Sequence, residues 1–157
     1  MRVVIDHIAG SRRGQRQEFS ATSRVRFGRH PDCEVSFDPY RDIDASSRHA
    51  ELRLAEAQRS SATEEVPQQA WVLVDLGSSN GTYVEGHRVT EARVLQNVPI
   101  AVEFGPGGPR IRLFVGDEKA IENLPPAPVE KARSNRLVFA VVGAVAVLVI
   151  AVLLMQC

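Results

Sequence analysis

The chain has 157 residues, 44 % of them apolar, and its 19 basic and 19 acidic side chains give a formal net charge of zero. This length suits one domain, and a neutral chain lacks the bulk positive charge that drives non-specific nucleic-acid binding. The averages hide an uneven chain. Residues 137–155 carry no charge and are apolar except for Gly143, whereas every charged residue lies within residues 1–136.

Apolar and polar residues alternate with a period of two at several places in residues 1–116, which is the pattern of half-buried strands. Glycines and prolines separate these runs. Many short strands at this spacing predict an all-β domain, either a sandwich or a barrel. The run at 71–76 is apolar on both faces, so we expect it to be a central strand. The predicted strands are at residues 3–6, 25–27, 50–55, 71–76, 100–104 and 111–115.

Residues 117–136 are interpreted as a linker. They combine mixed charge with three prolines, Pro125, Pro126 and Pro128, which disfavour helix and favour an extended spacer. The apolar stretch 137–155 would span roughly 28 Å as a helix, close to the hydrocarbon core of a bilayer. A buried core helix normally keeps a polar face, which this stretch lacks. We therefore predict one transmembrane helix in contact with the lipid bilayer, followed by a tail, residues 156–157.

Three basic residues precede the predicted span, and only an amide and a thiol follow it. The positive-inside rule therefore places the N-terminal domain in the cytoplasm, as in a tail-anchored protein. Ala140 and Ala144 form a small-xxx-small pair, a weak signal for helix pairing that a plain anchor would also show. Seventeen arginines against two lysines indicate a GC-rich genome, which favours a bacterial inner membrane. The two cysteines, Cys33 and Cys157, would lie on opposite sides of the membrane.

Three polar clusters lie in predicted loops at strand ends, where the loops of a sandwich gather. Arginines, hydroxyls and amides are suited to a phosphate, because guanidinium forks and hydroxyl or backbone donors fill its oxygen shell. Each cluster also has a structural interpretation, since Asn80-Gly81 alone is a hairpin turn signal. The clusters are Gly28-Arg29, Ser46-Ser47-Arg48-His49 and Gly77-Ser78-Ser79-Asn80-Gly81-Thr82.

Catalysis is disfavoured by the same residues. Ser46 and His49 lack an orienting carboxylate and a nucleophile elbow. The histidines and cysteines do not show zinc-ligand spacing, and no glycine-rich loop with Lys-Ser/Thr occurs. We therefore expect no enzyme, no metal and no cofactor.

Taken together, Gly28-Arg29, Ser46-x-x-His49 and Asn80-Gly81 resemble the forkhead-associated (FHA) domain, and the strings FGRHPDCEVSF, SSRHAEL and WVLVDLGSSNGTYVEGHRV extend the likeness. The resemblance covers residues 1–116. It implies an FHA-type β-sandwich of about eleven strands that binds phosphothreonine peptides and neither catalyses a reaction nor binds DNA.

The resemblance also implies roles for individual residues. Arg29 and Ser46 would contact the phosphate, Arg48 would be a second basic contact and Ser79 would add a hydroxyl. Ser47 would face the peptide, and Asn80 would hold its main chain. The motif residues with structural roles would be Gly28, His49, Gly81 and Thr82, with His49 bracing the binding loops.

The sequence departs from the family pattern at Glu85, where Asn is frequent, and at 97–99. The 38–44 connection is longer and more acidic than usual, which we expect to influence peptide preference. Residues 10–30 carry six arginines against one acid, Glu18. This local excess favours attraction of a phosphate, although a solvated basic hairpin would look the same.

These observations predict a membrane-anchored adaptor that recruits phosphothreonine-containing partners of a Ser/Thr kinase. The alternative is a phosphate-independent scaffold that assembles through a face of the same sandwich.

Overall fold

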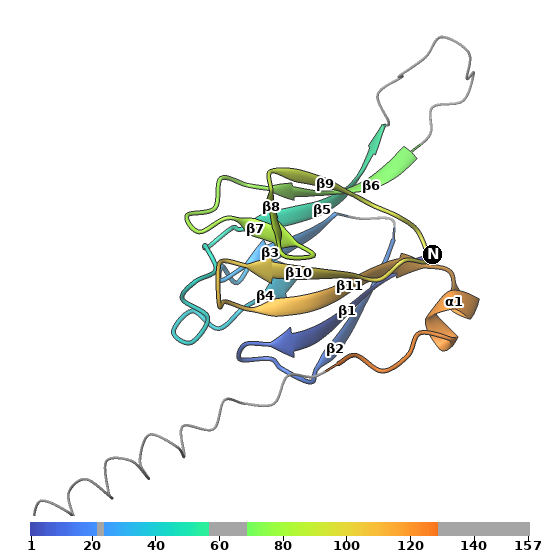
Figure 1. Cartoon of the computed structure of the whole chain (residues 1–157), viewed down its shortest axis with the longest axis horizontal. Coiled ribbons are helices and arrows are strands. Elements are labelled where there is room, and N and C mark those ends of the chain that lie inside the picture. Colours follow the sequence, from blue (N-terminus) through green and yellow to red (C-terminus); the bar gives the residue numbers. More distant parts are fainter. Residues whose placement is uncertain (22–23, 57–68, 129–157) are drawn as a thin grey trace, which may run out of the picture.

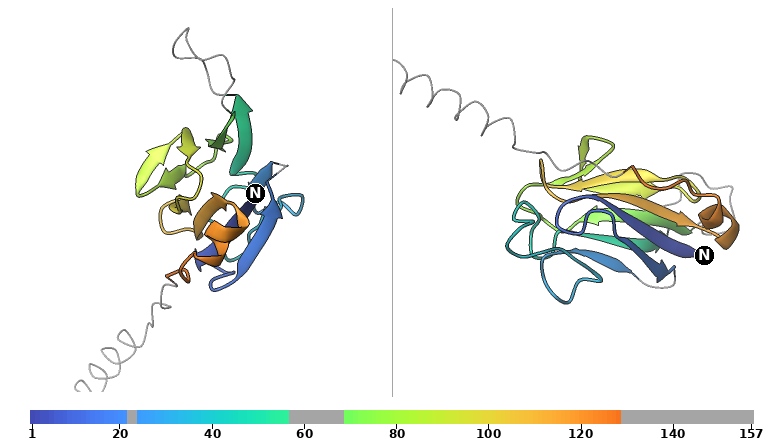
Figure 2. Two further views of the ribbon diagram at one scale, coloured as in Figure 1. Left: turned by 90° about the vertical axis from the view of Figure 1, so that its right-hand side faces the viewer. Right: turned by 90° about the horizontal axis from the view of Figure 1, so that it is seen from below.

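The computed structural model describes residues 1–21, 24–56 and 69–128. Eleven strands in these residues form two sheets that pack face to face (Figures 1 and 2). The six-stranded sheet has the order β2-β1-β11-β10-β7-β8, and the five-stranded sheet has the order β4-β3-β5-β6-β9. The strands are β1 (Arg2–Ala9), β2 (Arg16–Ser20), β3 (Val25–Gly28), β4 (Val35–Ser36), β5 (Ala50–Glu56), β6 (Gln69–Asp75), β7 (Thr82–Val84), β8 (His87–Val89), β9 (Glu91–Val94), β10 (Ile100–Phe104) and β11 (Arg110–Gly116).

The core lies between the two sheets. Alternate residues of β1, β11 and β10 meet alternate residues of β3, β5 and β6, as the period-two pattern requires. Three phenylalanines pack together in this layer. The Phe27 and Phe104 rings are stacked with their centroids 5.2 Å apart, and the Phe37 ring is tilted against Phe104 at a centroid distance of 5.0 Å. The phenylalanine cluster lies under the loops at one end of the sandwich, because each ring stands at or just beyond the end of its strand.

Strands β1 and β11 are buried on both faces. On the face away from the core, the Asp6 carboxylate lies between two guanidinium groups, 2.6 Å from Arg16 and 2.6 Å from Arg112. The sheet register causes this, since Asp6 is directly opposite Arg16 on β2 and opposite Arg112 on β11. The two hydrogen-bonded arginines lower the pKa of Asp6 even though burial opposes that shift.

The chain after β11 turns back along this face of the sheet (Figure 1). A short helix, α1 (Glu118–Glu122), is capped by the Asp117 side chain, which accepts a hydrogen bond from the Ala120 N–H. Beyond α1, Leu124, Pro126 and Ala127 line a cavity of about 400 Å³ together with residues of the β1–β2 hairpin. The first part of the predicted linker therefore packs on the domain.

The predicted β-sandwich is confirmed, and each of the six predicted strands is present. The run at 71–76 is a central strand as expected, since β6 lies between β5 and β9. The strands that the sequence did not predict are short or mostly exposed: β2, β4, β7, β8 and β9. Among the described residues, no helix is long and apolar enough to cross a bilayer. The predicted transmembrane stretch 137–155 lies outside the described residues.

Candidate functional site

The loops that carry the three motif clusters gather at one end of the sandwich, opposite the N-terminus (Figures 1 and 2). The β3–β4 and β4–β5 loops are joined through their backbones. The Arg29 N–H donates to the Ser46 carbonyl at 3.1 Å, and the His30 N–H donates to the Ser47 carbonyl at 2.9 Å. This pairing brings the Gly28-Arg29 cluster against the 46–49 cluster.

Gly28 is required by this close approach. A Cβ atom on Gly28 would lie less than 3.0 Å from the Ser47 carbonyl oxygen, a separation that real Cβ atoms do not show. The contact is with backbone, which cannot rotate away as a side chain can. The structural role that the family resemblance implies for Gly28 therefore has a steric basis.

The Arg29 side chain is positioned by the β4–β5 loop. Its Nε donates to the Ala45 carbonyl at 2.6 Å and its Nη1 donates to the Pro39 carbonyl at 3.0 Å. Within the described residues Nη2 makes no hydrogen bond. Two fixed bonds thus orient the guanidinium and leave donors for an anion.

The acidic β4–β5 loop owes its shape to two of its aspartates. Asp42 is buried and accepts hydrogen bonds from Ser11 of the β1–β2 turn and from the Asp38 N–H. The Asp38 carboxylate in turn accepts from the Tyr40 and Arg41 N–H groups. These carboxylates are therefore engaged with the protein's own donors, and the loop they hold supplies the carbonyls that orient Arg29.

Ser46 and Asn80 link the β4–β5 loop to the β6–β7 loop. The Ser46 hydroxyl accepts a hydrogen bond from the Ser79 N–H at 3.0 Å. The Asn80 amide donates to the Asp44 carbonyl at 2.9 Å. Because the Ser46 hydroxyl accepts the bond from Ser79, its own proton is available to an anion. Within the described part of the chain this proton has no hydrogen-bond acceptor.

His49 is completely buried beneath these loops. Its Nδ1 accepts a hydrogen bond from the Ser46 N–H at 2.9 Å, so its Nε2 carries the proton and donates to the Gly81 carbonyl at 3.1 Å. One imidazole thus ties the two loops together. Burial lowers the pKa of His49, which keeps the ring neutral and suited to this pair of bonds.

Asp75, which the sequence analysis did not single out, organises the β6–β7 loop. Its carboxylate accepts from the Gly77 and Ser78 N–H groups and from the hydroxyls of Ser78 and Thr82, at 2.6 to 2.9 Å. Although burial opposes the shift, these hydrogen bonds lower the pKa of Asp75. The signal available in the sequence was Asp75 followed by small and hydroxyl residues, a pattern typical of an Asx-type turn.

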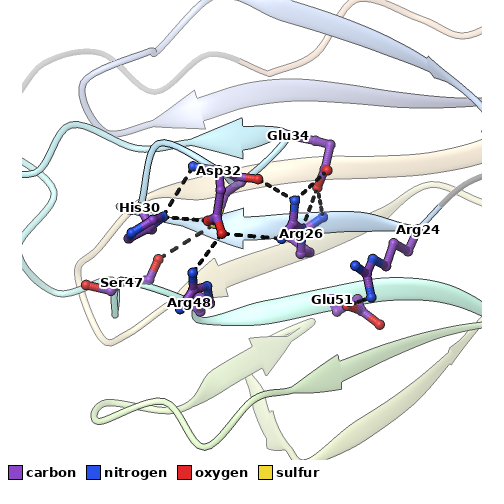
Figure 3. Close-up of polar contacts among 9 residues, drawn as sticks. Arg24, Arg26, His30, Asp32, Glu34, Ser47, Arg48 and Glu51 are labelled. Atoms are coloured by element: carbon purple, nitrogen blue, oxygen red, sulfur yellow. Dashed lines mark hydrogen bonds and ion pairs between the residues drawn. The ribbon is translucent and has the colours of Figure 1, made fainter.

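Ser47 and Arg48 lie on the exposed side of the β4–β5 loop. The Arg48 side chain is bound to Asp32 of the β3–β4 loop at 2.7 Å, and the other oxygen of Asp32 is 2.6 Å from His30 Nδ1 (Figure 3). Arg26 lies beside Asp32 and is bound to Glu34 at 2.9 Å. Arg48, predicted as a phosphate contact, is thus paired with a carboxylate in the free protein.

Ion pairs offset part of the positive charge expected from residues 10–30. Arg16 is paired with Asp6, Arg24 with Glu51, and Arg26 with Glu34. These acids come from other segments, so a local count of charges missed them. Arg29 is oriented by carbonyl groups and has no carboxylate partner within the described ranges.

The arrangement is that of an anion-binding surface. Guanidinium, hydroxyl and amide donors come together from three loops, while the buried acids and His49 support the backbone behind them. Among the residues that the structure describes, no group of histidine, cysteine and carboxylate side chains could hold a metal ion. Whether Arg29, Ser46, Ser47, Arg48, Ser79 and Asn80 contact a phosphopeptide stays a prediction.

Comparison with known proteins supports the resemblance seen in the sequence. The family model of the FHA domain matches residues 25–104. The glycogen accumulation regulator GarA of Mycolicibacterium smegmatis is 40 % identical over 70 residues, 45 % of this chain and 34 % of GarA. GarA of Mycobacterium tuberculosis has the same identity over 33 % of its length. The chain thus spans about a third of the length of these curated relatives.

Solved structures show the same fold at lower identity. The FHA domain of an Arabidopsis thaliana hypothetical protein has a TM-score of 0.56 and 21 % identity, covering 74 % of this chain and 86 % of that one. The FHA-1 domain of Mycobacterium tuberculosis Rv1747 has a TM-score of 0.53 and 24 % identity, covering 74 % of this chain and 97 % of that one. A structure from a structural and functional analysis of phosphothreonine-dependent FHA domain interactions has a TM-score of 0.52 and 23 % identity. The match covers 73 % of this chain and 97 % of that one.

Proposed function

Because the chain belongs to the FHA domain family, whose members are protein-interaction modules that bind phosphothreonine peptides, we propose that it is a membrane-anchored phosphothreonine reader. It recruits partners that a Ser/Thr kinase has phosphorylated. The observation that carries the proposal is Arg29, whose guanidinium is held by the Ala45 and Pro39 carbonyls and keeps donors for an anion.

The donors around Arg29 suit a phosphate monoester on a peptide. Ser46 offers a hydroxyl proton, and Asn80, whose amide donates to the Asp44 carbonyl at 2.9 Å, would hold the peptide main chain as the family resemblance implies. Each hydrogen bond to a charged oxygen contributes about 1.5–3 kcal/mol. Three or four of them, less the costs of ordering and desolvation, give an affinity of about micromolar. Binding at this strength is reversible and follows kinase and phosphatase activity.

The variants Ser46→Ala and Asn80→Ala distinguish a reader from a phosphate-independent scaffold. A phosphothreonine peptide library is presented to the full chain and to each variant, with Ser20→Ala, an exposed position on β2, as control. A reader loses phosphopeptide binding in both site variants and keeps it in the control. Capture of the same peptides by all four proteins, independent of phosphate, would favour the scaffold.

Membrane anchoring is the second part of the proposal. It rests on the uncharged stretch 137–155 and the basic residues before it, which predict a membrane anchor with a cytoplasmic domain. The excess of arginine over lysine favours a bacterial inner membrane. The test is cell fractionation of the full chain beside a chain that ends at residue 136. The full chain is expected in the membrane fraction after alkaline washing, and the shortened chain in the soluble fraction. Recovery of both in the soluble fraction would refute the anchor.

A further inference from the structure

Four charged side chains and His30 form an ionic cluster beside the candidate site, on the outer side of the β3–β4 loop and the start of β5 (Figure 3). It consists of Arg26, His30, Asp32, Glu34 and Arg48. Asp32 is the residue that joins the cluster to the site, because it is bound to Arg48, two positions after Ser46 in the β4–β5 loop.

Asp32 is the partner of Arg48 in the described structure. Arg48 Nη2 donates to Asp32 Oδ2 at 2.7 Å, and the two side chains are 55 % and 37 % exposed. The hydrogen bond from Arg48, opposed by desolvation and assisted by His30, lowers the pKa of Asp32 to about 2. Asp32 is therefore ionised at neutral pH and carries a full negative charge next to a basic residue of the loop.

The Asp32–Arg48 pair can be changed without breaking the bonds that hold the two loops together. Arg26 makes its closest ion pair with Glu34, at 2.9 Å, and lies farther from the Asp32 carboxylate, at 3.5 Å. The two loops are held together by the backbone bonds of Arg29 and His30 to the 46–47 carbonyls. Removing the charge of Asp32 therefore releases Arg48. It also weakens the contacts of His30 and Arg26 with the same carboxylate, at 2.6 and 3.5 Å, while the Arg26–Glu34 pair and the backbone bonds stay in place.

We infer that Asp32 determines how strongly Arg48 contributes to phosphopeptide binding: the free protein holds Arg48 on Asp32, and a bound phosphate gains Arg48 only by replacing that carboxylate. The inference rests on the proposed phosphothreonine function. Exposed ion pairs are weak, and a phosphate dianion is a stronger acceptor for a guanidinium than a single carboxylate. A bound phosphate can therefore replace Asp32 as the partner of Arg48. Breaking the Asp32–Arg48 pair reduces the net binding free energy that Arg48 contributes.

The inference is tested by a double-mutant cycle of Asp32→Asn and Arg48→Ala in the full chain. Affinity is measured with a degenerate phosphothreonine peptide pool and its unphosphorylated counterpart. Asp32→Asn should tighten phosphopeptide binding by about two- to fivefold, the range of an exposed ion pair. In the Asp32→Asn background Arg48→Ala should cancel the gain, and it should weaken wild-type binding by a smaller factor, because there Arg48 is held by the Asp32 carboxylate.

Two further variants control for charge and for folding. Glu34→Gln makes the same change in net charge at a residue of similar exposure, 33 % against 37 %, without a bond to Arg48, and should leave affinity within twofold of wild type. Asp32→Glu keeps the carboxylate and should retain wild-type affinity. Thermal unfolding of each variant shows that the domain is folded, and Asp32→Ser replaces Asp32→Asn if the latter is unstable.

The outcomes that overturn the inference are distinct. If Asp32→Asn weakens binding, Asp32 positions Arg48 productively and does not compete with phosphate. If the double variant keeps the tighter phosphopeptide binding, or Glu34→Gln binds as tightly as Asp32→Asn, the affinity depends on the net charge of the domain and not on the release of Arg48. If the wild type binds both peptide pools equally, the proposed function itself fails, and the role of Asp32 fails with it.

Discussion

The carbonyl oxygen of Ser47 occupies the place where a side chain on Gly28 would have to stand. This contact joins the last residue of β3 to the loop that carries the candidate phosphate ligands. It places Arg29 and Ser46 in neighbouring backbone positions, connected by the bond from the Arg29 N–H to the Ser46 carbonyl. The binding surface thus depends on a steric fit between two loops as well as on its polar donors.

Gly28→Ala is expected to separate these loops. The added methyl must push the Ser47 backbone away, and overpacking of this kind costs about 1–3 kcal/mol. Chemical denaturation should show this loss of unfolding free energy, and phosphopeptide affinity should fall with it. Gly14→Ala separates a clash from backbone strain. Nothing lies within 4 Å of a Cβ there, so a loss of stability in that variant comes from its positive φ of 84°, and its phosphopeptide affinity should stay that of the wild type. Wild-type stability and affinity for Gly28→Ala would contradict the steric argument.

Asp75→Ala should disorganise the β6–β7 loop. It removes the acceptor for two backbone N–H groups and two hydroxyls. Of these residues Thr82 is buried, and a buried donor left unpaired costs about 1–3 kcal/mol. Amide hydrogen exchange should rise at residues 77–82, and phosphopeptide binding should weaken because this loop carries Ser79 and Asn80. Unchanged exchange at Ser78 and Thr82 would show that the loop holds its shape by other means.

Asp6→Ala tests the buried ion pairs on the outer face of the six-stranded sheet. The Asp6 and Arg112 side chains are 8 % and 9 % exposed, so the substitution leaves a buried guanidinium without its carboxylate. Removing one partner of a buried pair costs about 3–5 kcal/mol. Glu18→Ala, which removes an exposed partner of Arg2, should cost less than about 1 kcal/mol. Equal, small losses for both variants in urea unfolding would contradict this assignment.

Stability should fall in mild acid because of two buried histidines. Burial lowers the pKa of both His7 and His49 below the ordinary value of 6.5. Between that value and the lower folded-state values the unfolded chain binds more protons, so the free energy of unfolding decreases as the pH falls below about 6.5. Above about pH 6.5 both rings are neutral in the folded and unfolded chain, and the contribution of the buried histidines to the free energy of unfolding is fully present.

The measurement is urea unfolding between pH 8 and pH 5, for wild type and for His49→Gln, with His87→Gln at an exposed position as control. The His49 variant should show a shallower decline than wild type. Stability that stays constant or rises from pH 7 to pH 5 would refute the titration of these buried rings.

The sequence predicted the strands whose apolar faces meet in the core, because a period of two persists wherever one face of a strand is buried. It did not predict β2 or β9, which are largely exposed and polar, or β4, which has two residues. Such strands are defined by pairing with a neighbour, and pairing depends on register that a local pattern does not contain.

In the candidate site, too, local sequence patterns located some residues, and contacts between distant residues were not predicted. The motif residues Arg29, Ser46 and Asn80 could be located from their order along the chain and their likeness to a family. The supporting roles of Gly28 and His49 came from the same likeness, whereas Asp75 was missed although its turn pattern is present in the sequence. The Asp32–Arg48 pair could not be located, because it joins residues 16 positions apart. The pairing of Arg16 with Asp6 likewise follows from the β1–β2 register, so the net charge of residues 10–30 overstated the field at the site.

The most direct test of phosphothreonine recognition is isothermal titration of the full chain with a phosphothreonine peptide and its unphosphorylated twin, repeated for Arg29→Ala and Arg29→Lys. The wild type should bind the phosphopeptide at about micromolar strength and show no detectable binding to the twin. Both variants should lose about 2 kcal/mol or more, since lysine lacks the fork that the two carbonyls orient. Equal binding of both peptides by the wild type, or full phosphopeptide affinity in Arg29→Ala, would contradict the account.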